Sequence, residues 1–104
     1  MAQFDIYENN EPESKDTIPF LLDVQHDLHG SLSTRMVVPL VSSYSVNNEI
    51  KKLCPVLTVM GKNVMMSTPE MAGYPVRDLG AKVVSAANQR TEIINAIDFL
   101  LGGF

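Results

Sequence analysis

Two histidines, His26 and His29, stand three residues apart and are the first candidates for chemistry in this sequence. Imidazole nitrogens bind zinc well, but a zinc site needs three or four ligands that converge on one point. Only Gln25 and Asp27 lie close to the pair, and no second cluster of ligating residues occurs elsewhere in the sequence. The pattern therefore predicts surface histidines in a turn over residues 27–31, with no metal and no cofactor.

The other candidates for catalysis also have simpler structural roles. Cys54 precedes Pro55 at the start of an apolar segment, which is typical of a buried, unreactive thiol. Asp23 interrupts an apolar segment, so we expect it to hydrogen-bond to a neighbouring loop or to Arg35 rather than to form an acid pair with Asp27. No glycine-rich phosphate loop and no Ser-His-Asp arrangement is suggested by the spacing. Together these observations favour a protein that is not an enzyme.

Composition limits the class of protein further. The sequence has 104 residues, of which 45% are hydrophobic and 19% charged, and this predicts a single globular domain over residues 1–104 with a modest core. The net charge of -4 argues against direct binding to the phosphates of DNA, which needs clustered Lys and Arg. With one cysteine, no export leader and no apolar run of about 18 residues, the chain is expected to be cytoplasmic, with no contact to a membrane.

The elements that must position these residues are mostly short strands. Hydrophobic patterning predicts strands at residues 3–7, 18–24, 35–41, 56–60 and 63–66, the last two as a hairpin around Gly61 and Lys62. The nearly continuous apolar run at 18–24 indicates a central strand covered on both faces. Pro39 predicts an edge or a bulge in the third strand. The polar segments 8–16 and 42–48 are predicted loops, the first of them mobile and without packing residues.

Only the end of the chain is predicted to be helical. The helix should begin near Ser85 or Asn88, either of which can serve as the N-cap, and should run to Leu101. Its apolar positions have the three-to-four spacing of one buried stripe: Ile93, Ile97, Leu100 and Leu101, with Ile94 beside them. We therefore expect a mainly β fold with one C-terminal α-helix.

Two glycines and an aromatic residue follow this helix. Glycine commonly ends a helix, so Gly102 and Gly103 have an ordinary explanation as a C-cap. The alternative is that the helix presents Phe104 and the terminal carboxylate to a partner. The sequence leaves both interpretations open.

Methionines are concentrated in the predicted strands, at Met36, Met60, Met65, Met66 and Met71. Methionine often fills irregular gaps in a core, and some of these residues should do so. Because successive strand residues point to opposite faces, Met65 and Met66 cannot both face the core. Apolar side chains on the outer face mark a partner surface. We therefore predict a homodimer that packs through Met36, Met60, Met65 and the helix residue Leu100.

Short motifs spread over almost the entire chain resemble one protein family. They are Gln3-Phe4, Leu22-Asp23-Val24-Gln25 with Asp27, Arg35-Met36-Val37-Val38-Pro39-Leu40, Leu53-Cys54-Pro55-Val56, Met65-Met66 with Met71-Ala72, Pro75-Val76, Leu79-Gly80 and Asn95-Ala96-Ile97. Their order and spacing resemble the CcdB toxin family, plasmid- and chromosome-borne poisons of DNA gyrase from type II toxin–antitoxin modules.

The resemblance implies a fold and a mode of action. The fold is an SH3-like small barrel, a five-stranded antiparallel sheet plus a small accessory sheet capped by the C-terminal helix, as in the toxins Kid and MazF. Members are homodimers whose paired C-termini enter the dimerisation domain of gyrase A and trap gyrase on cleaved DNA. A cognate antitoxin with a disordered C-terminal segment releases the toxin, and together they repress their own operon. Contact with DNA is therefore indirect.

The same resemblance assigns the gyrase contact to the end of the chain. The implied residues are Asp98, Leu101, Gly102, Gly103 and Phe104, with Leu28 and His29 of the predicted turn as a second contact. Well-known members end in Trp-Gly-Ile, whereas this chain has Gly102, Gly103 and Phe104 at the matching positions. Either Phe104 replaces the tryptophan as the aromatic anchor, or the contact uses other residues.

Two rival functions remain at the level of sequence. A ribonuclease toxin on the same fold would need an acid–base pair and a cationic group in a dimer groove, for which Arg35, Arg77, Asp78 and His29 are available. A dimeric interaction module without toxicity is the other alternative. A gyrase cleavage assay separates the two toxins, and an upstream antitoxin gene would exclude the module.

Overall fold

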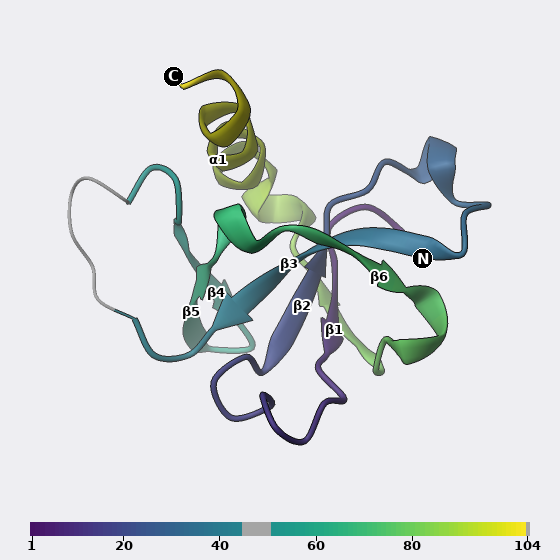
Figure 1. The fold of residues 1–104 in the computed structure, drawn as a ribbon. Helices are drawn as coiled ribbons and strands as arrows, with labels where there is room; N and C mark the ends of the chain where they lie inside the picture. The colour runs from purple at the N-terminus through teal and green to yellow at the C-terminus, as the bar shows by residue number, and fades with distance from the viewer. Residues whose placement is uncertain (45–50, 104) are drawn as a thin grey trace.

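Seven β-strands and one α-helix form the part of the chain that the structure describes, residues 1–44 and 51–103 of a computed structural model (Figure 1). The strands are β1 (Asp5–Glu8), β2 (Phe20–Asp23), β3 (Thr34–Val41), β4 (Val56–Val59), β5 (Lys62–Met66), β6 (Ala72–Pro75) and β7 (Lys82–Ser85). The helix α1 spans Arg90–Gly102, and the 3-10 helices are η1 (Asp27–His29), η2 (Thr68–Glu70), η3 (Val76–Asp78) and η4 (Ala87–Gln89). The predicted mainly β fold with one C-terminal helix is confirmed.

The strands curl into an antiparallel half-barrel in the order β4-β5-β3-β2-β1-β7, and β6 also pairs with β3. β3 is twice as long as most of its neighbours, so one of its edges holds two strands. Residues 34–37 of that edge pair with β6, and residues 40–41 pair with β5. Within the described residues, hydrogen bonding therefore connects the expected main and accessory sheets into one.

Pro39 lies in a central strand, so it is not at an edge of the whole sheet, but β3 is unpaired on one side there, as the missing donor predicted. On one side it stands opposite Leu21 of β2 in a regular register. On the other side it falls between the residues that pair with β6 and those that pair with β5, and its carbonyl accepts a hydrogen bond from Ser67 N at 2.9 Å. The N–H that proline lacks would point into this gap, so no ladder bond is lost.

The predicted hairpin joins β4 and β5, with its turn one residue earlier than expected. Met60 and Gly61 both have positive φ, 51° and 79°, whereas Lys62 already pairs with Val59. Two consecutive positive φ values match the twist of the flanking strands in a two-residue turn. Met60 therefore stands at the exposed tip of the hairpin, with two thirds of its surface accessible.

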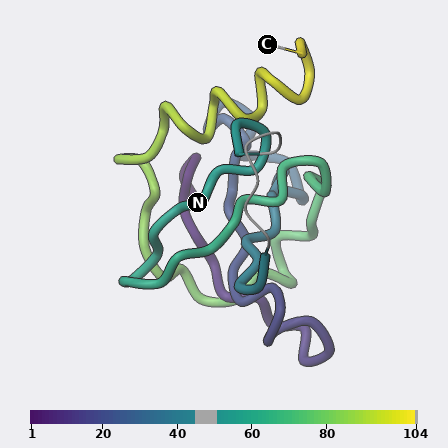
Figure 2. Tube along the Cα trace, turned by 90° about the vertical axis from the view of Figure 1, so that its left-hand side faces the viewer, coloured from purple at the N-terminus to yellow at the C-terminus, as the bar shows by residue number. Residues whose placement is uncertain are grey.

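The core lies on the concave face of the half-barrel. β2 is buried along its whole length, as its apolar run predicted. Side chains from most strands meet those of α1 there, among them Ile6, Leu22, Val38, Leu40, Val64, Met66, Ile93 and Ala96. Figure 2 shows α1 lying across one end of the sheet. The helix therefore closes that end of the core.

α1 begins later than the sequence suggested. Neither Ser85 nor Asn88 is its N-cap; that position is Gln89, without a side-chain capping bond. Ser85 is the last residue of β7, where it pairs with Asp5, and its hydroxyl accepts a hydrogen bond from Ala87 N at 3.2 Å. Because pairing with β1 keeps Ser85 extended, the helix follows only after the short η4 turn.

The buried stripe of α1 is shorter than predicted. Ile93 and Ala96 are buried, and Ile94 and Ile97 are half-buried against the core. Leu100 is exposed and Leu101 is 76% exposed, so the prediction was wrong for the last turn. Figure 1 shows the reason, because the last turn of α1 extends beyond the sheet. The final apolar residues of the helix therefore face solvent.

A glutamine side chain joins the helical end of the chain to an edge strand. The amide of Gln89 accepts a hydrogen bond from Thr58 N at 3.1 Å and donates one to Thr58 O at 3.2 Å. This pair of bonds reproduces the pattern that a neighbouring strand would offer to the outer edge of β4. The Gln89 clamp thus connects the start of α1 with the far end of the strand order.

The polar segment after β1 is held in place, contrary to the prediction that it lacks packing residues. Asn9 is buried, and its Nδ2 donates hydrogen bonds to Ser14 Oγ at 3.0 Å and to Ile18 O at 2.8 Å. Its Oδ1 accepts a bond from Glu11 N at 3.0 Å. One asparagine thus organises the loop by hydrogen bonds rather than by apolar contact. Of the other predicted loop, 42–48, the part from residue 45 onward lies outside the described residues.

Candidate functional site

The end of α1 brings together most of the residues that were predicted to bind gyrase. Asp98, Leu101 and Gly102 are exposed there, with Leu100 beside them. Gly103 adopts a left-handed conformation with φ of 79°, and its N–H donates to Phe99 O at 2.9 Å. The interpretation as a C-cap is therefore confirmed. Phe104 lies outside the described residues.

A cation covers one flank of this helix end. The Nζ atom of Lys52 lies 5.0 Å from the centre of the Phe99 ring. This geometry is that of a cation–π contact at the surface. Sequence patterning gave no indication of it, because Lys52 and Phe99 come from segments far apart in the chain. The contact leaves Leu101, two residues further along α1, uncovered.

The second predicted contact, the η1 turn, is separate from the helix end within one chain (Figure 1). The side chain of His26 accepts a hydrogen bond from Leu28 N at 3.0 Å and caps this turn. Leu28 is 80% exposed, and His29 is exposed as well. The turn thus presents a large apolar side chain on a short, hydrogen-bonded support.

Behind η1 lies a buried ion pair. Arg35 Nε donates to Asp23 Oδ2 at 2.7 Å, and both side chains are fully buried. Arg35 Nη2 also donates to Gln25 O at 2.9 Å, at the start of the η1 segment. Burial raises the pKa of the Asp23 carboxyl, and the hydrogen bond from Arg35 opposes that rise. The predicted bond between Asp23 and Arg35 is confirmed, and its role is to anchor the turn.

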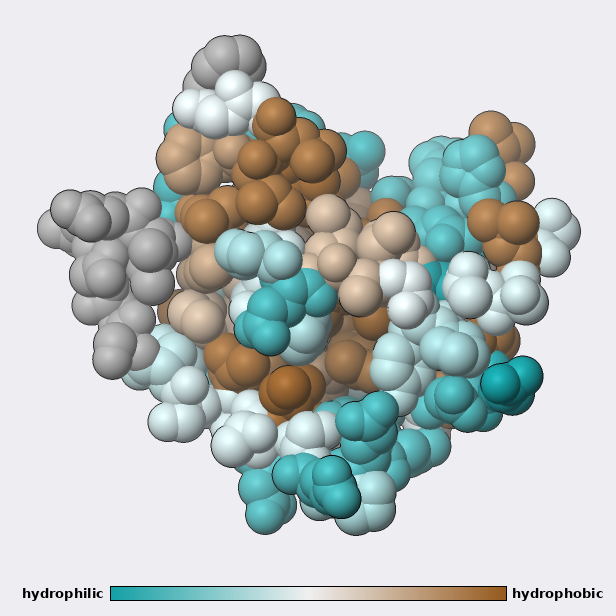
Figure 3. Space-filling view, in the orientation of Figure 1, coloured by the Kyte–Doolittle hydropathy of each residue, from teal (hydrophilic) through white to brown (hydrophobic). Residues whose placement is uncertain are grey.

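The residues predicted for the dimer interface lie in different places on the surface. Met60 is at the β4–β5 turn, while Met65 is half-buried between its strand partners Val41 and Val56. Met36 is exposed on β3 opposite Gly73. Met66 is fully buried, so the two adjacent methionines do face opposite sides of the sheet. Figure 3 shows a gathering of hydrophobic surface over α1 and just below it.

Two of the cations available for acid–base chemistry, Arg35 and Arg77, have different carboxylate partners and different exposure. Arg35 is engaged with Asp23, whereas Arg77 is 86% exposed with Asp78 at 3.9 Å. Cys54 is buried, as expected. Within residues 1–44 and 51–103, no three His, Cys, Asp or Glu side chains are placed to hold a metal ion.

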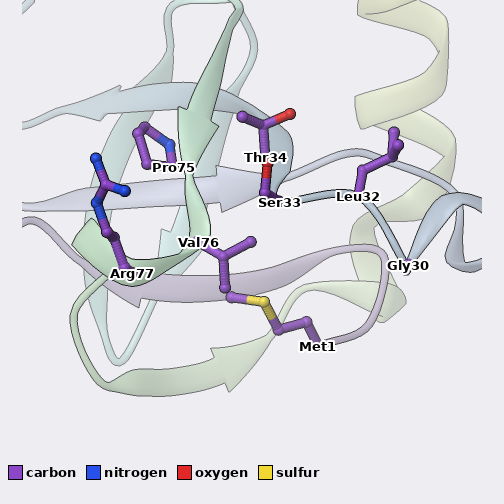
Figure 4. Close-up of a pocket in the computed structure, with 8 residues that line it drawn as sticks. All are labelled: Met1, Gly30, Leu32, Ser33, Thr34, Pro75, Val76 and Arg77. Carbon is purple, nitrogen blue, oxygen red and sulfur yellow. The ribbon is translucent and has the colours of Figure 1, made fainter.

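A hollow of about 660 Å³ lies between the segment after η1 and the start of η3 (Figure 4). In Figure 4 the side chains of Met1 and Val76 point toward each other, with Arg77 at one margin. Its lining residues are Met1, Gly30, Leu32, Ser33, Thr34, Pro75, Val76 and Arg77. Because this lining contains no carboxylate, imidazole or thiol, the hollow suits binding rather than proton transfer.

No helix in the described ranges is both long enough and apolar enough to cross a membrane.

Residues 3–103, which are nearly the whole chain, match the family model described as CcdB protein. The half-barrel with its C-terminal helix agrees with that match. Members of this family are not enzymes, and their partners are gyrase A and an antitoxin. The chain therefore belongs to the CcdB family and is a gyrase-poisoning toxin of a toxin–antitoxin system.

Proposed function

We propose that this toxin acts in the cytoplasm as a homodimer whose two α1 ends enter the dimerisation domain of gyrase A. There it would trap gyrase covalently attached to cleaved DNA. The proposed contact consists of Asp98, Leu101, Gly102, Gly103 and Phe104, with Leu28 and His29 of η1 as a second region. The antitoxin would neutralise the toxin through a disordered C-terminal segment and join it in repressing their operon.

The exposure of Leu101 is the observation that supports this proposal best. A leucine that is 76% exposed on the last turn of a helix has most of its apolar surface in water. Burying such a side chain against a partner contributes about 1.5–3 kcal/mol. Gly103 then ends the helix in a left-handed conformation. Both features suit a contact that is completed only in a complex.

Dimerisation is supported by further exposed apolar side chains. Met36, Met60 and Leu100 are all exposed, and Met65 lies beside the exposed Val56. Figure 3 shows hydrophobic surface gathered over α1 and just below it, and a contiguous apolar surface of this kind is typical of a partner site. The net charge of -4 agrees with contact to DNA only through gyrase or the antitoxin.

A gyrase cleavage assay with supercoiled DNA and ATP tests the proposal. The toxin should convert the DNA to the linear form, whereas a variant without residues 102–104 should not. Leu101→Ala should weaken trapping, and Leu32→Ala, which also truncates an exposed leucine, is the matched control. Trapping by the shortened chain would move the contact to Leu28 and His29. Cleavage of RNA by the toxin alone would favour the ribonuclease alternative.

The aromatic residue at the end of the chain can be tested by itself. If Phe104 replaces the tryptophan of other members, Phe104→Ala should cost about 2 kcal/mol, or roughly thirtyfold in affinity for gyrase A. Titration of isolated gyrase A by calorimetry would measure this loss. An unchanged affinity would assign the anchoring role to Leu101 and the helix instead.

A further inference from the structure

A second hollow lies on the convex face of the sheet, between the loop after β1 and the strand β6. Its volume is about 160 Å³, which is close to that of a cavity that holds one benzene molecule. It therefore has room for one large apolar side chain. The residues that line it are Asn9, Glu11, Ser14, Ile18, Leu21, Val37, Pro39, Glu70, Ala72 and Tyr74, and we call it the Glu11–Glu70 groove.

The floor of the groove is apolar and is built from regular structure. Leu21, Val37 and Pro39 come from the paired strands β2 and β3, and Ala72 comes from β6, which pairs with Val37. The wall on the other side is the loop that the buried Asn9 organises by its hydrogen bonds. Because the floor and the wall are both held by hydrogen bonds, the groove is formed before any partner arrives.

Two carboxylates line this groove, and they come from different segments of the chain. Glu70 comes from η2, and its Oε1 accepts a hydrogen bond from Ser67 Oγ at 2.6 Å. Glu11 comes from the loop and accepts hydrogen bonds from Ser14 Oγ at 3.3 Å and from Tyr74 Oη at 3.5 Å. Both carboxylates are therefore oriented by neighbouring hydroxyl groups. No lysine or arginine is among the residues that line the groove.

The groove continues into a neighbouring hollow of about 410 Å³ that shares Glu11 and Tyr74 with it. This second hollow also contains Arg77 and Asp78, so it carries both signs of charge. An extended peptide that crosses the hydrogen bond between Tyr74 and Glu11 would occupy both hollows. The larger hollow then suits polar residues that follow the apolar one.

We propose that the Glu11–Glu70 groove binds an extended segment of the antitoxin that carries one large apolar side chain next to a lysine or arginine. The apolar side chain fills the groove, and the cation pairs with the carboxylates of Glu11 and Glu70 that line it. This inference rests on the proposed neutralisation of the toxin by a disordered segment. Its chemistry follows from the apolar floor and the paired negative charges.

Charge and size favour such a segment over a second copy of this chain. A second copy would bring another net charge of -4 toward two carboxylates. A stable dimer also buries about 1,200 Å² or more, which a groove for a single side chain does not provide. A disordered segment, in contrast, binds by inserting single anchors along an extended path.

A double charge reversal with a matched control tests the assignment. Glu11→Lys with Glu70→Lys changes the net charge from -4 to 0, since each substitution adds two positive charges. Glu13→Lys with Glu92→Lys makes the same change at exposed positions outside the groove. Thermal unfolding would show that both variants fold. Binding of the full-length antitoxin would then be measured by calorimetry, and trapping would be measured in the gyrase assay.

The groove variant should bind the antitoxin at least about tenfold more weakly, while the control changes by less than about twofold. Replacing the antitoxin's lysine or arginine next to the apolar side chain with glutamate should restore affinity for the groove variant. The same replacement should not raise the affinity for the control variant. If the groove variant and the control variant bind the antitoxin equally well, the inference is wrong. It is also wrong if the groove variant loses the dimer but still binds the antitoxin, because the groove would then hold a second copy of the chain. Gyrase trapping by the groove variant should equal that of the wild type. Failure of the wild type to trap gyrase would reject the proposed function separately, because antitoxin binding is measured without gyrase.

Discussion

Arg35 and Asp23 form the most consequential pair of side chains in this toxin. Both are buried and joined at 2.7 Å, so removing either one leaves a charge without its partner inside the protein. Such changes destabilise proteins by about 3–5 kcal/mol. Asp23→Asn should therefore lower the free energy of unfolding by about that amount in urea denaturation.

An exposed ion pair provides the control for this prediction. Arg77 lies 3.9 Å from Asp78, with most of both side chains in water. Pairs of this kind contribute about 0–1 kcal/mol. Arg77→Ala should thus leave the denaturation midpoint almost unchanged. If Asp23→Asn and Arg77→Ala lowered the free energy of unfolding equally, burial would not explain the importance of the Arg35–Asp23 pair.

The stability of the toxin in alkali should depend on Tyr7. Burial and the carboxylates of Asp5 and Asp23 raise the pKa of Tyr7 to about 12. Between pH 10 and 12 the folded state keeps this proton while the unfolded state loses it, so stability falls as the pH rises. The loss should approach about 2 kcal/mol. Urea denaturation across this range should show a smaller decline for Tyr7→Phe, and parallel curves for the two proteins would contradict the prediction.

At the scale of residues, the sequence revealed those side chains that break a local pattern. Asp23 was recognisable because a carboxylate interrupts an apolar strand, and Arg35 was the available partner. Asn9, Gln89 and the Lys52–Phe99 contact were not recognisable. Each of them acts through a partner that pairing or packing brings close, and polar residues in polar segments carry no periodic signal.

Among the elements, β4 and α1 are coupled by the Gln89 clamp. Gln89→Ala removes both hydrogen bonds to Thr58 and should cost about 1–2 kcal/mol. Gln89→Glu keeps the size of the side chain but replaces the donor to Thr58 O with a carboxylate oxygen, so it should cost as much. Hydrogen exchange at the Thr58 amide would show how often the contact between Gln89 and β4 opens. Asn88→Ala, at the exposed neighbouring position, is the control, and equal protection in all variants would contradict the coupling.

The sequence predicted β1 to β5 and the helix, but it predicted neither β6 nor β7, nor the point where α1 extends beyond the sheet. The ends of those five strands lie within two residues of the predicted ones, and the hairpin is present. The spacing of Leu100 and Leu101 continues that of Ile93 and Ile97, although only the earlier residues reach the core. Periodicity shows which side of a helix is apolar, while the size of the sheet beneath determines how much of that side is covered.

At the scale of the whole molecule, we predict that the toxin is a homodimer. Light scattering should give about twice the chain mass of 11.5 kDa at micromolar concentration. Met65→Asp and Leu100→Asp should shift the toxin toward the monomer, because obligate interfaces resemble a protein core and exclude charge. Leu32→Asp, at another exposed leucine, should leave the mass unchanged. A monomeric wild type would contradict the dimer.

The arrangement of strands was predictable through the family resemblance rather than through the pattern alone. Nothing local in the sequence indicates that β3 holds β5 and β6 on one edge, or that β1 lies between β2 and β7. Lys82–Ser85 has two adjacent valines and no alternation, so β7 gave a weak signal. These features depend on pairing over long stretches of chain, which a window of neighbouring residues does not record.

The pairing of β1 with β7 also sets the order of events during synthesis. Asp5 of β1 pairs with Ser85 of β7, which is made much later, and α1 follows β7 in the chain. Proteins dominated by such distant pairings fold in milliseconds to seconds, and this pairing cannot form until both strands exist. A nascent chain that has not reached Ser85 therefore has neither the β1–β7 pairing nor a helix end to present. The cell thus meets this poison only after the last strand has been translated.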